Sequence, residues 1–272
     1  MKRTQITILL LALLLICQSV MPAFAQDATT VYVTISDGEG KLVLSHAAVS
    51  VTDVDEDQQL TIHDTLYCAH EQYYTGGAQA GYLAETSAWG LSLMKLWGVE
   101  NGGSYSYYLN NASPMGLTDP VAAGNTVKAF VYTDTTAFSD TFSYFDQDAI
   151  ALEEAGNVTL TLQSSGFDPE TFAPVVAPVA GAKILVDGQD SGVVTDAEGK
   201  CTVAVTKSCV ISATSDTLTL VPPVCVVDLG TEPLPEVSTP EATPIVPYVI
   251  IGAGVLVLVI LIVVLVIKSK KK

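Results

Sequence analysis

The chain has 272 residues and a formal net charge of −17, and its charge is spread very unevenly. Residues 26–247 hold all 29 acidic residues against six lysines and no arginine, which gives this part a formal charge of −23. Binding nucleic acid requires clustered Lys and Arg to neutralise phosphates, so nucleic acid is excluded as a partner. An acidic exterior suits solubility, cation binding or repulsion from anionic surfaces.

The N-terminus has the layout of a secretory signal peptide. Two basic residues precede an apolar run at 6–20, and Ala23-Phe24-Ala25 supplies small residues before Gln26. We therefore expect residues 1–25 to be a signal peptide, and residues 27–165 to begin the exported part. Ile16 is too large for a lipidation motif at Cys17, so a lipid anchor is not expected.

The first exported segment, 27–165, has the pattern of an α+β module. Apolar residues alternate at 31–35, 49–51 and 158–162, and 105–109 and 127–133 are also typical of strands. Between them, Ile62, Leu66, Ala69 and Tyr73 recur at helical spacing, which predicts a helix with one apolar stripe. The expected fold is a small sheet crossed by a helix.

A second module follows a segment rich in proline and alanine. We expect residues 166–178 to be a linker, and residues 179–229 to form an all-β sandwich of short valine-rich strands joined by tight turns. Cys201, Cys209 and Cys225 fall here and Cys68 falls in the first module. Export permits disulfides, and both a local bridge among the three and a free buried Cys68 remain open.

The C-terminal end predicts a membrane anchor. Residues 230–247 contain five prolines and are expected to form an extended stalk. Residues 248–267 carry no charge, and twenty residues of helix span ~30 Å, about the thickness of a bilayer core. Four lysines within residues 268–272 predict a cytoplasmic tail, with everything before the helix outside the cell.

Two resemblances concern the exported modules. The helix Leu60–Leu66, the run Trp97-Gly98-Val99 and the segments Tyr105–Asn111 and Val121–Tyr132 resemble bacterial domains similar to the C-terminal domain of transcobalamin. This resemblance covers about a third of the mature chain and implies a small α+β fold that binds a ligand or partner, a corrinoid in its sharpest version. Tyr105 stands where that family usually has Trp, and Asn111 where it has Gly.

The second resemblance lies in residues 181–228. Lys183–Gly188 followed by Gly192–Lys200 is similar to the hairpin of carboxypeptidase-regulatory-like β-sandwiches. That family implies a spacer or adhesive module, and fold analogy assigns it no chemistry.

Residues 53–64 have the oxygen spacing of a calcium-binding loop. Calcium takes six to eight hard oxygen ligands, and a helix follows this loop. The pattern resembles EF-hand loops and, with Asp at its last position, those of dockerins, although Gln58 replaces the usual Gly. The alternative is a solvated acidic turn in which Thr61 caps the helix. The expected ligands are Asp53, Asp55, Asp57, Gln59, Thr61 and Asp64.

Other candidate sites carry less specific signals. His63 and His70 share a helical stripe, but lie too far apart for one zinc ion without further ligands. The favoured interpretation is an exposed helix face with one histidine against the sheet. An aromatic platform could bind a ring-bearing ligand or a sugar, although each ring taken singly is better explained by the core. The expected ligand-binding residues are Tyr105, Tyr107, Tyr108 and Asn110.

These observations predict a membrane-anchored, non-enzymatic cell-surface protein for binding or adhesion, of bacterial type, with calcium as its one candidate cofactor. Its partner would be an extracellular protein, a glycan or a small ligand. Capture of a corrinoid or another small ligand is the alternative, and an aromatic cleft near Tyr105 would favour it. A wall protein sorted by a transpeptidase, suggested by Leu234–Ser238, ranks third. An enzyme ranks last, because no histidine accompanies a nucleophile motif.

Overall fold

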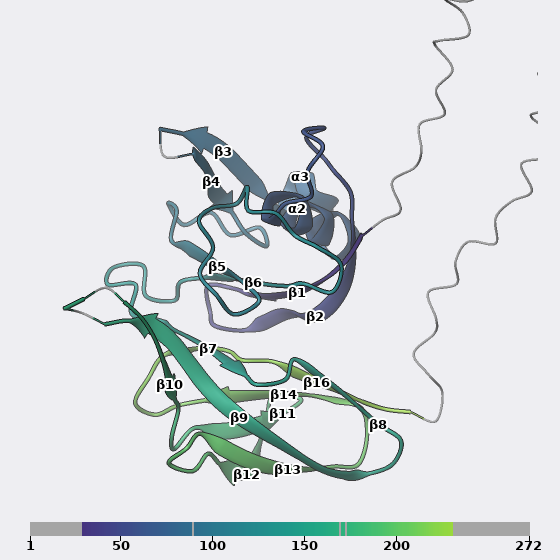
Figure 1. Cartoon of the computed structure of the whole chain (residues 1–272), viewed down its shortest axis with the longest axis vertical. Helices are drawn as coiled ribbons and strands as arrows, with labels where there is room; N and C mark the ends of the chain where they lie inside the picture. Colours follow the sequence, from purple (N-terminus) through teal and green to yellow (C-terminus); the bar gives the residue numbers. More distant parts are fainter. Residues whose placement is uncertain (1–28, 89, 169, 172, 231–272) are drawn as a thin grey trace, which may run out of the picture. The chain divides into compact units, whose positions relative to one another are not determined.

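The computed structural model describes residues 29–230 except 89, 169 and 172 (Figure 1). The predicted signal peptide, the stalk after Gly230, the membrane helix and the basic tail lie outside these residues. Within the described part of the chain, no helix combines the length and the apolar character that a membrane crossing requires. The described residues are mostly β-structure, with a short helical segment after the first two strands.

The N-terminal sheet contains four strands in the order β2-β1-β6-β5. Strands β1 and β2 form an antiparallel hairpin, β6 runs parallel to β1, and β5 pairs antiparallel with β6 at the sheet edge. Val31, Val33 and Ile35 alternate along β1 and are fully buried, which confirms the alternation seen in the sequence. The bounds are β1 (Thr29–Ser36), β2 (Leu42–Val51), β5 (Tyr105–Leu109) and β6 (Thr126–Val131).

Helix α2 (Ile62–Tyr73) packs against β1 and β2, and the short α3 (Gly77–Gly81) follows it (Figure 1). Ile62, Leu66 and Ala69 are fully buried and share one core with β1, as the helical spacing predicts. Tyr73, predicted in the same stripe, is 46% exposed instead, and its hydroxyl donates to the Ala48 carbonyl at 2.7 Å. A two-stranded hairpin, β3 (Leu83–Ser87) and β4 (Gly90–Lys95), comes next.

The remaining strands form two sheets around a second core. One sheet has the order β10-β9-β7-β15, with β13 also paired to β9, and the other has the order β12-β11-β14-β16-β8. Phe145, Leu160, Ile184 and Ile211 are fully buried between them. The bounds are β7 (Thr141–Phe145), β8 (Ala149–Leu152), β9 (Gly156–Phe167), β10 (Pro174–Pro178), β11 (Lys183–Val186), β12 (Gln189–Val194), β13 (Lys200–Val205), β14 (Cys209–Thr214), β15 (Leu220–Val221) and β16 (Cys225–Leu229).

The segment expected to link two modules is part of this second core region. Residues 174–178 form β10, which pairs with β9, and the prolines at its ends suit an edge strand. Val158, Leu160 and Leu162 on β9 are buried in the core that contains β13 and β14. The change from the first core to the second therefore falls between β6 and β7, ahead of residues 166–178. All four cysteines in the described part of the chain are buried and unpaired.

Candidate functional site

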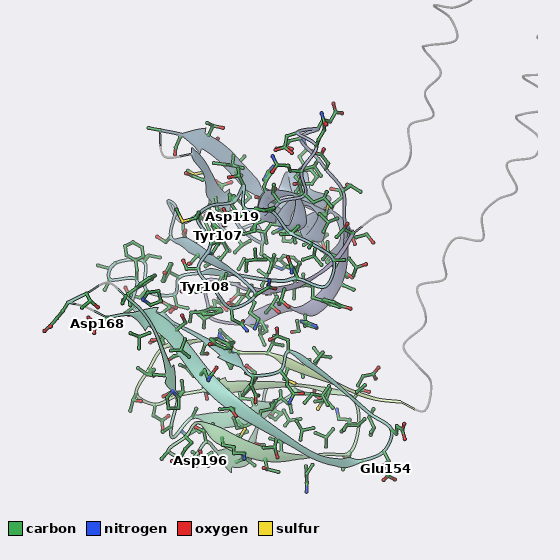
Figure 2. The ribbon with its side chains drawn as sticks, viewed as in Figure 1. Tyr107, Tyr108, Asp119, Glu154, Asp168 and Asp196 are labelled. Atoms are coloured by element: carbon green, nitrogen blue, oxygen red, sulfur yellow. The ribbon has the colours of Figure 1, made fainter. Side chains whose placement is uncertain are left out.

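A groove of about 540 Å³ opens beside β5, next to Tyr105. Its walls are residues 90–94 of β4, Gly102 and Gly103, Tyr105 and Tyr107 of β5, and the loop 115–119. Two of the four predicted ligand-binding residues therefore line it. Figure 2 labels Tyr107 next to Asp119, with Tyr108 on the opposite side of the strand.

Tyr105 fixes the shape of the groove. Its hydroxyl lies 2.7 Å from the Met94 carbonyl oxygen and 2.8 Å from that of Val99, and it accepts the N–H of Asn101 at 2.9 Å. These contacts tie β5 to β4 and to the preceding loop, and burial raises the pKa of Tyr105. Tyr105 is thus a wall residue whose hydroxyl is already satisfied within the protein.

Tyr107 and Asp119 present the polar and aromatic groups of the groove. Burial raises the pKa of Tyr107, and the negative charge of Asp119 raises it further. The ring is partly buried against the first core, and the Asp119 carboxylate also accepts the N–H of Met115 at 2.8 Å. Met115 itself is 97% exposed at the rim.

Tyr108 and Asn110, also predicted to bind the ligand, lie elsewhere. Alternation along β5 sends Tyr108 to the other face of the sheet, where its ring stacks on Phe142 with centroids 3.5 Å apart. Asn110 closes the turn after β5: its N–H donates to Thr126 at 2.8 Å, and its side chain accepts the Thr126 N–H at 2.9 Å. Both residues make these contacts within the protein, and neither lines the groove.

The loop 115–119 is held by the start of α2. The N–H groups of Ile62 and His63, which an α-helix leaves unpaired at its start, donate to the carbonyls of Asp119 and Leu117 at 3.1 and 2.9 Å. Leu117 is fully buried and anchors the loop in the first core. Sequence reasoning missed this wall and β4, although the Asp119-Pro120 pair marks a turn there.

The acidic loop brings together three of its six predicted ligands. One carboxylate oxygen from each of Asp53, Asp55 and Asp57 lies within 4.8 Å of the others, an arrangement that could hold a cation. Desolvation within the loop, followed by the charges of Asp57 and Asp64, raises the pKa of the exposed Asp55. Gln58 has a φ of +70°, so the residue in the usual glycine position does adopt the left-handed conformation.

Asp64 and Thr61 cap α2, as the alternative interpretation of the loop expects. Asp64 is fully buried, and its carboxylate accepts the N–H of Val54 at 2.9 Å, the N–H of Thr61 at 2.8 Å and the Thr61 hydroxyl at 2.7 Å. The bond from the Thr61 N–H, together with the Asp64 N–H that donates to the Thr61 hydroxyl at 3.3 Å, forms the capping box of α2. Gln59 stays exposed and donates its N–H to Asp57 at 2.8 Å.

The two histidines of α2 are held by separate partners. Nδ1 of His63 lies 2.9 Å from the Tyr82 hydroxyl, whereas His70 bonds to the Leu66 carbonyl and the Trp97 N–H. His70 is fully buried, and burial lowers its pKa to about 4. Of the two histidines, His70 is therefore part of the protein interior.

The chain matches no family model, no curated protein and no solved structure.

Proposed function

We propose that this chain is a non-enzymatic ligand-capture protein of the cell surface, anchored by the helix expected at 248–267, and that its ligand occupies the groove beside Tyr107. The groove carries this proposal. Its volume, about 540 Å³, lies within the usual range for small-molecule sites. A flat aromatic face would instead have favoured adhesion to a protein.

The lining of the groove favours an uncharged or cationic ligand. The Tyr107 ring offers an apolar face for stacking, and the Asp119 carboxylate is an acceptor for hydroxyl or ammonium groups. An anionic ligand would meet Asp119 in a region whose formal charge is already −23 over residues 26–247. A neutral glycan fits these terms better than a phosphate or a nucleotide does.

Calorimetry of the exported region with neutral glycans and corrinoids tests the proposal. Tyr107→Ala removes the stacking face, and a loss of ~1.4 kcal/mol corresponds to about tenfold weaker binding. Tyr73→Ala, an exposed tyrosine of α2 outside the groove, is the matched control and should bind like the unmodified protein. Equal affinity of the two variants would contradict the assignment of the groove, provided that both melt like the parent.

The edge position of β5 favours adhesion as the second candidate. The Ser104 carbonyl accepts from Tyr132 and the Asn110 N–H donates to Thr126, so alternate residues of β5 point their backbone groups at β6. The backbone groups of Tyr105 and Tyr107 then point out of the sheet, beside the groove. An extended segment of a partner protein could add there as a further strand.

Hydrogen exchange separates the two candidates. Strand addition should slow exchange of the Tyr105 and Tyr107 amide protons, because those amides would donate to the partner backbone. A ring-bearing ligand that stacks on the Tyr107 side chain should leave both amides at their free exchange rates. The amide of Tyr108, which points at β6, is the internal control in both cases.

A further inference from the structure

Strand β6 turns Val127, Ala129 and Val131 toward the first core, and its other face carries a buried lysine, Lys128. The proposed capture function does not use this lysine. The side chain of Lys128 is 7% exposed. Its Nζ donates to the Asn111 Oδ1 at 2.7 Å and to the Asp148 Oδ1 at 2.5 Å. One amine thus contacts both a carboxamide and a carboxylate in a nearly closed space.

Aromatic residues lie beside this lysine. Nζ is 5.7 Å from the centre of the Tyr144 ring, and Tyr108, whose ring stacks on Phe142, pairs with Lys128 across β5 and β6. Burial lowers the pKa of Lys128, an effect that the adjacent Asp148 opposes. An apolar surrounding of this kind favours a neutral amine, which is the nucleophilic form.

We propose that Lys128 and Asn111 join through an intramolecular isopeptide bond, with Asp148 as the group that carries the protons. Nζ of Lys128, as the neutral amine, attacks Cγ of Asn111, whose Oδ1 it already contacts, and passes one proton to the Asp148 carboxylate as the new bond forms. Asp148 returns a proton to the departing amide nitrogen, so the Cγ–Nδ2 bond breaks and ammonia leaves. A new Nζ–Cγ amide forms, the carboxylate is regenerated, and the protein loses one NH₃.

Asn111, and not Asp148, is the electrophile in this reaction because of the proton balance. Attack on Asn111 leaves Asp148 free to accept and return protons. Attack on Asp148 would consume the carboxylate that contacts Nζ and would release water instead of ammonia. The two routes therefore differ in the mass that the protein loses.

The crosslink would constrain the groove wall at residues 115–119, and its formation would not require a bound ligand. Residues 111 and 128 flank the segment that contains the loop 115–119, so the bond would close this segment into a covalent ring. Such a closure restricts the unfolded chain in the same way as a disulfide does, but it resists reduction.

Peptide mass mapping of the denatured full chain tests the proposal. An acylated Lys128 resists trypsin, so residues 96–183 should appear as one peptide, ~17 Da lighter than the sequence requires through loss of NH₃. Cleavage before Asp119, which lies inside the proposed ring, should leave the two halves joined. Asp148→Asn should give ordinary cleavage after Lys128 and the full mass, because its amide cannot take the proton. Lys207→Met removes an exposed ion pair with Asp187, leaves the cleavage sites at Lys95 and Lys183 in place, and should keep the crosslink.

Three results would overturn the proposal. The full sequence mass with ordinary cleavage after Lys128 in the unmodified protein would show an ion pair and nothing more. A loss of ~18 Da, with the branch mapped to Asp148, would assign the other electrophile, since that route releases water. An unchanged crosslink in Asp148→Asn would remove Asp148 from the reaction. The first two results are measured on the unmodified protein, so they hold even if the Asp148→Asn variant fails to fold.

Discussion

Acidification should destabilise the fold through one buried histidine, His70. The Leu66 carbonyl lies 2.6 Å from Nδ1, and the Trp97 N–H donates to Nε2 at 2.9 Å. Nδ1 must therefore carry the proton of a neutral ring, with Nε2 as the acceptor. A second proton on Nε2 would break the bond to Trp97 and place a charge in the first core.

The size of this effect follows from the pKa. Burial lowers the pKa of His70 from 6.5 to about 4. The unfolded state then binds the proton first as pH falls, so the contribution of His70 is complete above pH 6.5 and is lost progressively down to pH 4. A shift of this size corresponds to about 3 kcal/mol of the free energy of unfolding.

Urea denaturation of the exported region at pH values from 7.5 to about 4.5 measures this loss. His70→Gln keeps a polar side chain without the titration, so its stability should vary less with pH than that of the parent. His46→Gln is measured in parallel, because burial also lowers the pKa of His46. Parallel pH curves for the parent and His70→Gln would refute the assignment to His70.

Two further predictions concern the acidic loop and the helix after it. Asp64→Ala should lower the free energy of unfolding by about 3–5 kcal/mol, because it leaves buried donors on Val54 and Thr61 without an acceptor. A loss below ~1 kcal/mol in urea denaturation would contradict the capping role. Calcium at ten times its dissociation constant should stabilise the parent by ~1.4 kcal/mol in thermal melting. Asp55→Asn should lose that stabilisation, with magnesium and sodium at matched ionic strength as controls. Identical melting with calcium and with chelator would reduce Asp53, Asp55 and Asp57 to a solvated turn.

The elements that follow from local pattern could be predicted from the sequence. Alternation places Val31, Val33 and Ile35 on one buried face, and a period of two sends Tyr105 and Tyr107 to the same side of β5. The start of α2 was also visible, because Thr61 and Asp64 stand at capping-box spacing. These features depend on residues within about four positions of one another.

The partners of these elements could not be predicted in the same way. The alternation of β9 shows that one face is buried, but not that β13 pairs with it from about forty residues further along the chain. The proline and alanine content of residues 166–178 suits an edge strand as well as a linker, and pairing with β9 decides the matter. Lys128, set between apolar neighbours on a strand, gives no sign in the sequence that it contacts Asp148.

Asp64 shows why the metal ligands were harder to predict than the loop itself. An oxygen at this position satisfies both a calcium loop and the capping box of a helix, because each requires an acceptor at the same spacing. Burial distinguishes the capping role from the calcium role. Asp64 is fully buried and accepts three hydrogen bonds, whereas Asp55 and Asp57 are exposed.

The same capping box connects the acidic loop to the groove through the backbone. Asp64 orders the first turn of α2, and the N–H groups of Ile62 and His63 from that turn hold the loop 115–119 by its carbonyls. The groove wall is therefore set by main-chain contacts and by the buried Leu117, not by exposed side chains. A wall fixed in this way requires little ordering when a ligand binds, which lowers the entropic cost of capture. It also means that any change at Asp64 reaches the groove, because the loop depends on the helix start that Asp64 holds in place.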